Sequence, residues 1–483
     1  MAAYNLTLLT DLYELTMMQG YFKSQSKETV VFDVFYRTNP SGSGYAITCG
    51  LEQVIDYVKG LSFSYEDIDY LRSLNIFEND FLDYLAGFHF SGDIYAIPEG
   101  TVVFPREPLL KVIAPIMEAQ LVETAILNII NHQSLIATKA SRVSYAAGGG
   151  VMEFGLRRAQ GPDAGTYGAR AAVIGGCTGT SNVLTGAMFG VPVQGTHAHS
   201  WVMSFPDEYT AFKTYANMYP DACILLVDTY DTLKQGVPNA IRVFQEMKEE
   251  GVKSKLFGIR LDSGDLAYLS KKARKMLDDA GFPDAIIAAS SDLDEYLIDS
   301  LRTQGAQITS WGVGTNLITS ADCPAFGGVY KLAAVKKEGE EEFTAKIKIS
   351  ENPVKITNPG NKTIFRIYDK ATGKIRADLI CLAGETYDEE KDLKIFDPEA
   401  TWKKLTLKAG TYTLRELLVP VFLNGQCVYD SPATMDIKKY CEGELATLWD
   451  ETRRLVNPQE VYVDLSKPLY DLKQELLNAR EEE

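Results

Sequence analysis

The sequence has little histidine and no organised cysteine. Four histidines occur in 483 residues, and the seven cysteines are scattered without a Cys-x-x-Cys spacing. An odd number of scattered cysteines argues against a disulfide framework and against a zinc module, and it is typical of a reducing compartment. We therefore expect a cytoplasmic protein.

Long apolar runs and a targeting segment are also missing. No apolar run approaches the roughly 18–20 residues that a bilayer span needs. Residues 1–5 show no basic region followed by an apolar one, so we predict no signal peptide and no membrane partner. The net charge of −17 argues against nucleic acid as a partner. It leaves room for a small anionic substrate, because a few arginines in a cleft suffice.

Several catalytic motifs are absent. Gly175–Thr180 lacks the lysine of a Walker A loop, and neither a serine nucleophile elbow nor a metalloprotease helix occurs. What remains is a globular composition, 46% hydrophobic and 23% charged, in a chain long enough for two or three domains.

A change of pattern near residue 150 indicates the domain organisation. Residues up to about 145 suggest an α+β domain or part of one, and a hairpin-rich and then helical region follows residue 336. Between them, short apolar runs alternate with helical periodicities, which is typical of an irregular parallel (β/α) barrel at residues 146–335. A doubly wound open sheet is the structural alternative. The eight runs are Val151–Gly155, Ala171–Gly175, Val191–Gly195, Ile224–Asp228, Phe257–Asp262, Ile286–Ser290, Ile308–Gly312 and Gly328–Lys331.

Polar and glycine residues follow these predicted strands, at the end where parallel barrels carry their active sites. Two of the four histidines, His197 and His199, lie in one such stretch, Gly195–Trp201. If the preceding Val191–Gln194 is a strand, both imidazoles share one face. They could bind metal or satisfy buried polar groups, or one could be a nucleophile or an acid/base. A metal site lacks an obvious third ligand.

Other strand ends suggest recognition of anions and sugars. Ser290 and Ser291, together with Gly314 and Thr315, could bind a phosphate through hydroxyl and backbone N–H groups.

Asp262 and Asp265 could accept hydrogen bonds from sugar hydroxyls or hold Mg²⁺, although Asp265 could equally be a helix cap. Arg260 suits a carboxylate or phosphate better than a structural ion pair. Arg157 and Arg158 are adjacent on a segment expected to be extended, so they face opposite ways and at most one should reach a ligand. Phe154 could stack on a flat ring.

In these segments the sequence resembles the nicotinate phosphoribosyltransferase family over nearly its full length. The matching motifs are LTDLY at 9–13, FGLRRAQG at 154–161, GTHAHS at 195–200, LVDTYDT at 226–232, RLDSGD at 260–265, GVGT at 312–315, NPG at 358–360 and LVPVF at 418–422. The resemblance implies an α/β fold, with an irregular (β/α) barrel and a discontinuous α+β domain built from both chain ends, residues 1–145 and 336–483.

The resemblance also implies an activity. Members transfer phosphoribosyl from 5-phosphoribosyl 1-diphosphate to nicotinate, giving nicotinate mononucleotide and diphosphate in NAD salvage. ATP is a co-substrate that phosphorylates the histidine matching His199. Mg²⁺ is expected mainly on the diphosphate and ATP rather than on protein ligands, and the expected assembly is a homodimer with shared active sites.

Individual roles carry over residue by residue. His199 would be the phosphohistidine, with Arg260 and Asp262 as the other catalytic residues. Asp262 would contact the ribose. Thr196 and Arg260 would contact nicotinate, and Tyr13, from the partner subunit, and Phe154 would stack on its two faces. Arg157 would meet anionic groups. The phosphate contacts would be Ser290, Ser291, Gly314 and Thr315. His197 receives no role.

Three other functions remain open from the sequence. A nicotinamide-specific phosphoribosyltransferase would use the amide instead of the acid. A barrel isomerase or aldolase would act on a sugar phosphate without ATP, with His199 as an acid/base. A non-catalytic metabolite-binding protein on the same fold would bind without turnover, because the fold alone does not fix activity.

Overall fold

The computed structural model describes residues 5–252 and 254–479, and the chain forms two compact units. The first unit comprises 1–135, 325–432 and 440–483, and the second comprises 136–324 and 433–439. The first unit thus contains both ends of the chain. The sequence predicts domain limits near residues 145 and 335, and these limits stay a prediction.

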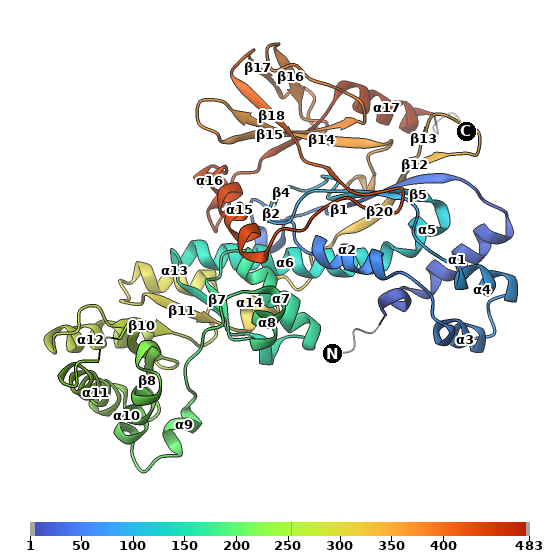
Figure 1. The fold of residues 1–483 in the computed structure, drawn as a ribbon. Helices are drawn as coiled ribbons and strands as arrows, with labels where there is room; N and C mark the ends of the chain where they lie inside the picture. Colours follow the sequence, from blue (N-terminus) through green and yellow to red (C-terminus); the bar gives the residue numbers. More distant parts are fainter. Residues whose placement is uncertain (1–4, 253, 480–483) are drawn as a thin grey trace. The chain divides into compact units, whose positions relative to one another are not determined.

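The second unit is built on a curled sheet of six parallel strands in the order β7-β6-β11-β10-β9-β8, which forms half of a barrel (Figure 1). β8 is buried along its whole length, as expected for a parallel strand covered on both faces. The elements are β6 (Val151–Glu153), α7 (Pro162–Ile174), β7 (Gly179–Thr180), α8 (Val183–Phe189), α9 (His199–Met203), α10 (Glu208–Met218), β8 (Cys223–Leu226), α11 (Val237–Glu249), β9 (Phe257–Leu261), α12 (Leu266–Asp279), β10 (Ile286–Ala289), α13 (Glu295–Thr303), β11 (Ser310–Val313) and α14 (Thr315–Ile318).

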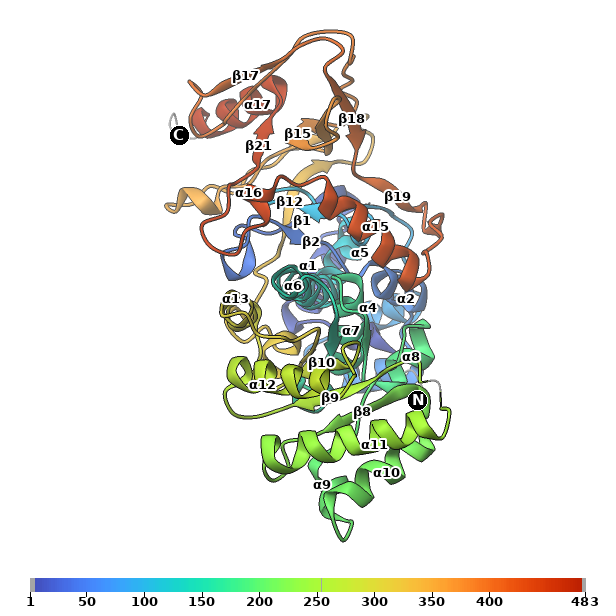
Figure 2. The same cartoon turned by 90° about the vertical axis from the view of Figure 1, so that its left-hand side faces the viewer.

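Three of the helices that follow strands, α8, α12 and α13, begin at side-chain caps. Asp265 accepts a hydrogen bond from Tyr268 N at 2.9 Å and starts α12, and Asn182 caps α8 in the same way. α10, α11 and α12 lie along β8, β9 and β10 (Figure 2). Because the six strands are parallel, the residues just after each strand gather at one edge of the sheet.

The irregular α/β barrel expected from the sequence is confirmed, but three of its details are wrong. Ala171–Gly175 is the buried end of α7 and its cap, not a strand. Gly328–Lys331 does not belong to the barrel, because it enters an antiparallel strand of the first unit. Val191–Gln194 forms only an isolated bridge, Thr180 to Val193, and His199 starts a helix, so the two histidines do not share a strand face.

The first unit contains a seven-stranded antiparallel sheet, β13-β12-β1-β5-β3-β19-β20, and a four-stranded sheet, β18-β14-β15-β21. β1 pairs with β5 on one side and with β12 on the other, some 300 residues later in the chain, with Asp33 opposite both Lys111 and Lys331. One apolar core extends from Leu15 in α1 to Leu469 in α17. Segments near both ends of the chain, α1 (Leu12–Lys23) and α17 (Lys467–Asn478), therefore pack into the same core.

The first unit's remaining elements are mostly short. They are α1 (Leu12–Lys23), β1 (Thr29–Phe35), β2 (Ala46–Ile47), α2 (Leu51–Gly60), α3 (Tyr65–Ser73), α4 (Asn79–Ala86), β3 (Asp93–Ala96), β4 (Val102–Val103), β5 (Leu110–Pro115), α5 (Ile116–Leu121), β12 (Val329–Lys336), β13 (Thr344–Ala345), β14 (Lys362–Asp369), β15 (Ile375–Leu382), β16 (Leu393–Phe396), β17 (Lys404–Leu407), β18 (Tyr412–Glu416), β19 (Val419–Leu423), β20 (Gln426–Cys427), α16 (Asp450–Arg453), β21 (Tyr462–Leu465) and α17 (Lys467–Asn478). α6 (Glu123–Ala147) and α15 (Thr434–Ala446) contribute residues to both units. Of the helices in the described ranges, none is long and apolar enough to cross a membrane.

Candidate active site

Arg260, near the end of β9, joins the residues that follow β9 and β10 to the segment of Thr196 and His197 before α9. Its Nε donates to Ser290 Oγ at 3.1 Å, and its Nη1 donates to Thr196 Oγ1 and, at 3.3 Å, to the His197 carbonyl. Its Nη2 lies 3.3 Å from Asp262 Oδ1. The structure thus gathers Thr196, Asp262 and Ser290 around one half-buried guanidinium.

This arrangement limits how Arg260 can meet a ligand. A guanidinium has five N–H donors, and most of those of Arg260 already point at protein oxygens. A carboxylate that binds Arg260 bidentately must therefore replace Thr196 or Asp262. The structural ion pair, which the sequence made the less favoured alternative, is present between Arg260 and Asp262.

His199 is the first residue of α9, and its imidazole faces three polar side chains. Nδ1 lies 3.1 Å from Thr229 Oγ1. Nε2 lies 3.8 Å from Asp262 Oδ2 and 3.9 Å from Asp228 Oδ1. The side chain is 39% exposed, so it is positioned by protein groups and remains accessible to a ligand.

Asp228 follows β8 closely and has no role in the sequence analysis. Its carboxylate is buried, and Oδ2 accepts hydrogen bonds from Asp262 N at 2.7 Å and from Ser263 Oγ at 2.8 Å. Within the described ranges Oδ1 has no hydrogen-bond partner. The signal in the sequence was the position of Asp228 and Thr229 at a strand end, in the LVDTYDT motif.

His197 has a structural role. Its buried Nε2 accepts a hydrogen bond from Leu226 N at 3.2 Å, and the ring packs edge-on against Tyr215 at 4.8 Å. Because Nε2 accepts, the proton of the neutral ring is on Nδ1. Burial lowers the pKa of His197 to about 4, so the ring is neutral at neutral pH.

The segments after β10 and β11 lie side by side, because these strands are neighbours in the sheet. Ser290 is buried, whereas Ser291 and Asp292 are exposed and have left-handed backbone conformations, with φ of 96° and 41°. The Asn316 side chain donates to the Asp292 carbonyl at 2.8 Å and ties the two segments together. The residues expected to bind phosphate are thus adjacent, on a backbone held in an uncommon conformation.

Phe154 lies against this region. A Cβ at Gly312 would come within 2.6 Å of the Phe154 ring and 3.5 Å of Ser290 Cβ, so only glycine fits there beside the aromatic ring. Arg157 is exposed, but on a 3₁₀ turn, Leu156–Arg158, and not on an extended segment as expected. The alternating orientation expected for Arg157 and Arg158 is therefore wrong.

Tyr13 and Gly314, one of the residues expected to bind phosphate, lie in different units. Tyr13 is 47% exposed on α1 of the first unit. Gly314 precedes Thr315, the first residue of the four-residue helix α14 in the second unit. The stacking role of Tyr13 in a shared active site stays a prediction.

Across residues 5–252 and 254–479, no group of three or more His, Cys, Asp or Glu side chains could hold a metal ion by itself. The histidine pair in particular is divided between two tasks, a buried acceptor and an accessible imidazole. What the site offers chemically is one imidazole nitrogen, two carboxylates and an arginine at a partly open strand-end edge.

Three family profiles match consecutive parts of this chain. They are the nicotinate phosphoribosyltransferase (NAPRTase) N-terminal domain at residues 8–131, the NAPRTase family at 150–371 and the NAPRTase C-terminal domain at 361–473.

Individual proteins agree with the profiles. The chain is 47% identical over 477 residues to a Bacillus subtilis nicotinate phosphoribosyltransferase, covering 98% of this chain and 96% of that protein. The crystal structure of human nicotinic acid phosphoribosyltransferase superposes with a TM-score of 0.82 at 29% identity, covering 97% and 100%. A nicotinate-nucleotide pyrophosphorylase from Pyrococcus furiosus, at 24% identity and a TM-score of 0.68 over 92% and 98%, shares the fold.

Proposed function

Because the chain belongs to the nicotinate phosphoribosyltransferase family, we propose that it couples ATP hydrolysis to nicotinate phosphoribosyl transfer through a phosphohistidine at His199. Nicotinate and 5-phosphoribosyl 1-diphosphate would give nicotinate mononucleotide and diphosphate, a step of NAD biosynthesis. The near-full-length match to the Bacillus subtilis enzyme supports the transfer reaction. The surroundings of His199 support the ATP-dependent half.

His199 suits a phosphoryl acceptor. If Nδ1 donates its proton to Thr229 Oγ1, the Nε2 lone pair is free to attack the γ-phosphorus of ATP while ADP leaves. The imidazole becomes cationic as the P–N bond forms, and the carboxylates of Asp228 and Asp262, within 4 Å of Nε2, stabilise that charge. Water later cleaves the P–N bond and releases phosphate.

The same two carboxylates explain why Mg²⁺ suits this site. By themselves they would repel the phosphates of ATP and the diphosphate, and Asp228 Oδ1 is buried without a hydrogen-bond partner among the residues described. A Mg²⁺ held mainly by the substrates' phosphates would find oxygen ligands in Asp228 and Asp262. Its chemistry there is to neutralise phosphate charge and stabilise the leaving group.

The other assigned side chains would position nicotinate and the sugar. Arg260 and Thr196 would bind the nicotinate carboxylate, and Phe154 would cover one face of the ring. Asp262 would contact the ribose. Expulsion of diphosphate builds positive charge on the ribose, so a planar nucleophile held in place matters more than a strong base.

The remaining assignments concern the anionic groups and the assembly. Arg157 would meet anionic groups, and the residues contacting the ribose 5-phosphate would be Ser290, Ser291, Gly314 and Thr315. Tyr13 would stack on the other face of the ring from the partner subunit of a cytoplasmic homodimer.

Labelling from [γ-³²P]ATP tests the proposal. We expect acid-labile, base-stable label on the wild-type protein with Mg²⁺ and none on His199→Asn. His89→Asn, which changes an exposed histidine of the first unit, should label like wild type. Folded wild-type protein that takes up no label would show that the phosphohistidine step is wrong. Formation of nicotinate mononucleotide without ATP tests the transfer reaction separately.

A further inference from the structure

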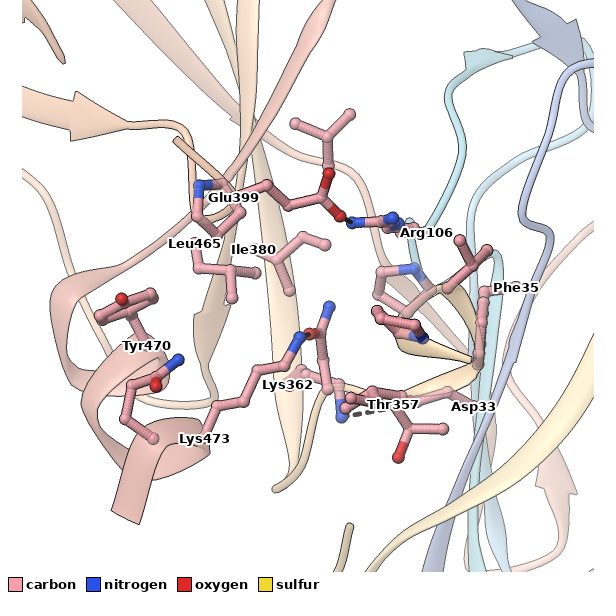
Figure 3. Close-up of a pocket in the computed structure, with 18 residues that line it drawn as sticks. Asp33, Phe35, Arg106, Thr357, Lys362, Ile380, Glu399, Leu465, Tyr470 and Lys473 are labelled. Carbon is pink, nitrogen blue, oxygen red and sulfur yellow. Dashed lines mark hydrogen bonds and ion pairs between the residues drawn. The ribbon is translucent and has the colours of Figure 1, made fainter. Parts of the chain in front are cut away.

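The first unit contains a cavity of about 80 Å³ that the proposed reaction does not use. At about 10–15 Å³ per water molecule, this volume has room for roughly five or more water molecules. That space is comparable to the size of a phosphate or carboxylate with a short organic group. Its walls come from β1, β14, β15, β21 and α17 and from the segments at 106–108, 353–358 and 398–399 (Figure 3). Every lining residue belongs to the first unit.

Two of the three cations that line the cavity are paired with carboxylates. Lys362 Nζ lies 2.7 Å from Asp33 Oδ2, both side chains being buried. Arg106 forms an ion pair with Glu399 at the side of the cavity seen at the top of Figure 3. These four charges cancel, so they give the cavity no net charge.

Lys473 is the third cation. Its side chain extends from α17 and donates to Asn358 Oδ1 at 2.9 Å (Figure 3). Within residues 5–252 and 254–479, no carboxylate forms an ion pair with Lys473. The cavity therefore has one ammonium group in excess.

The surroundings of Lys473 disfavour its charge in the absence of a ligand. Burial, and then the nearby positive charge of Arg106, lower the pKa of Lys473 to about 8, and the negative charge of Glu399 offsets only part of this shift. A desolvated ammonium without a counter-ion is costly, and a bound anion removes that cost by supplying the missing charge. The lining also includes the apolar side chains of Ile380 and Leu465, which suit a short hydrocarbon group.

We propose that this cavity binds a small organic anion, a phosphate monoester or a short carboxylate, with Lys473 as its charge partner. The ligand would be held by the ammonium group and the apolar side chains of Ile380 and Leu465. This site is separate from the chemistry at His199, because its lining contains none of the residues assigned to that reaction.

Calorimetric titration of the full-length protein tests the proposal, with inorganic phosphate, methyl phosphate and propionate as probes. Phosphate can also bind in the second unit, so the informative quantity is the difference in binding between the wild-type protein and the variants. We expect Lys473→Gln to weaken one binding event at least tenfold. Lys467→Gln, which changes an exposed lysine of the same helix, should bind like wild type. Methyl phosphate and propionate distinguish a phosphate ligand from a carboxylate.

A second variant blocks the cavity without removing a charge. Val354 lines the cavity and is 45% exposed, so Val354→Trp can occupy the space at little cost to the core. It should abolish the same binding event that Lys473→Gln weakens. Unchanged binding of all three probes in both variants, with circular dichroism like that of wild type, would overturn the proposal. No transferase assay enters this test, so it is independent of the proposed function.

A sulfate titration between pH 6.5 and 9.5 adds a readout that a structural lysine would not change. Sulfate carries the same charge throughout this range, whereas Lys473 loses its proton as the pH rises through about 8. We expect sulfate affinity to fall above pH 8 in wild type and to lose this dependence in Lys473→Gln. An identical pH dependence in the two proteins would contradict the proposal. Both proteins share the other groups that face Lys473: Arg106, Lys362, Asp33, Glu399 and Tyr470.

Discussion

Two charged clusters differ in how far their groups are exposed to solvent. At the strand ends of the second unit, Arg260 is half-buried and the neighbouring Asp228 has one carboxylate oxygen without a hydrogen bond among the described residues. In the first unit, Arg366 is fully buried and contacts Asp378 at 2.6 Å and Glu444 at 3.4 Å. The first arrangement is partly exposed, with the His199 and Asp262 side chains accessible to a ligand, whereas Arg366, Asp378 and Glu107 are fully buried and contact one another.

The charge balance of the Arg366 cluster supports this contrast. Arg415 also pairs with Glu444, at 2.6 Å, giving two cations and two anions. The fifth member, Glu107, has its pKa raised well above the usual range by burial and by the charge of Asp378. Protonated Glu107 makes the cluster neutral, which is what a site without solvent requires.

The largest expected effect is on stability, in Arg366→Met. Removing the guanidinium leaves buried carboxylates without their partner, and we expect the free energy of unfolding to fall by about 3–5 kcal/mol. Urea denaturation followed by circular dichroism measures this. Arg72→Gln, which removes an exposed ion pair, should unfold close to wild type. Equal midpoints for the two variants would show that burial does not distinguish the clusters.

His197 extends the comparison, because it lies beside the active-site residues yet is buried like Arg366. Its pKa falls from about 6.5 in the unfolded chain to about 4 in the fold, so only the unfolded state takes up a proton between these values. Stability present above pH 6.5 is therefore lost as the pH falls toward 4, by about 3 kcal/mol. Urea midpoints from pH 4 to 7 measure it.

His197→Gln should remove this part of the acid dependence, because glutamine keeps a hydrogen-bond acceptor but does not titrate. His89→Gln, at an exposed position, should keep the wild-type dependence. If His197→Gln loses stability with falling pH as steeply as wild type, burial of His197 is not the cause.

Arg260→Lys should change activity far more than stability. Lysine cannot hold Thr196, Ser290 and Asp262 with one planar group, and misplacement of about 1 Å can cost about 100-fold in rate. We expect kcat/KM for nicotinate to fall at least about 100-fold with a urea midpoint near that of wild type. Arg242→Lys, an exposed control, should retain full activity. A loss of stability without loss of activity would place Arg260 with Arg366.

The smallest expected effect is at Ser291. Its φ of 96° is unfavourable for serine and open to glycine, so Ser291→Gly should change the free energy of unfolding by no more than about 1 kcal/mol. A KM for 5-phosphoribosyl 1-diphosphate that rises in steady-state assays would indicate that the strained serine contributes to phosphate binding. An unchanged KM would remove Ser291 from the proposed phosphate contacts.

The sequence predicted correctly those features that depend on neighbouring residues, such as helical periodicity and helix caps. The alternation of apolar runs and helical periodicities predicted the parallel sheet, and the position of Asp265 before a helical periodicity predicted a possible cap, which its bond to Tyr268 N confirms. The motifs from LTDLY to LVPVF predicted the family, which the comparisons confirm.

Other features depended on tertiary contacts. Ala171–Gly175 is a short apolar run that suits a buried helix end as well as a strand, and packing around α7 decides between them. Gly328–Lys331 pairs with β1, a partner some 300 residues away that local sequence does not reveal.

The sequence by itself determined the family, the α/β fold and the presence of two histidines close together in the chain. Only the tertiary structure decided what each histidine does. A strand edge brings the Leu226 amide to His197 and makes it a buried acceptor, while Thr229 and the two aspartates surround the accessible ring of His199. Burial and long-range partners set the chemistry of an imidazole, and neither can be read from its neighbours in the chain.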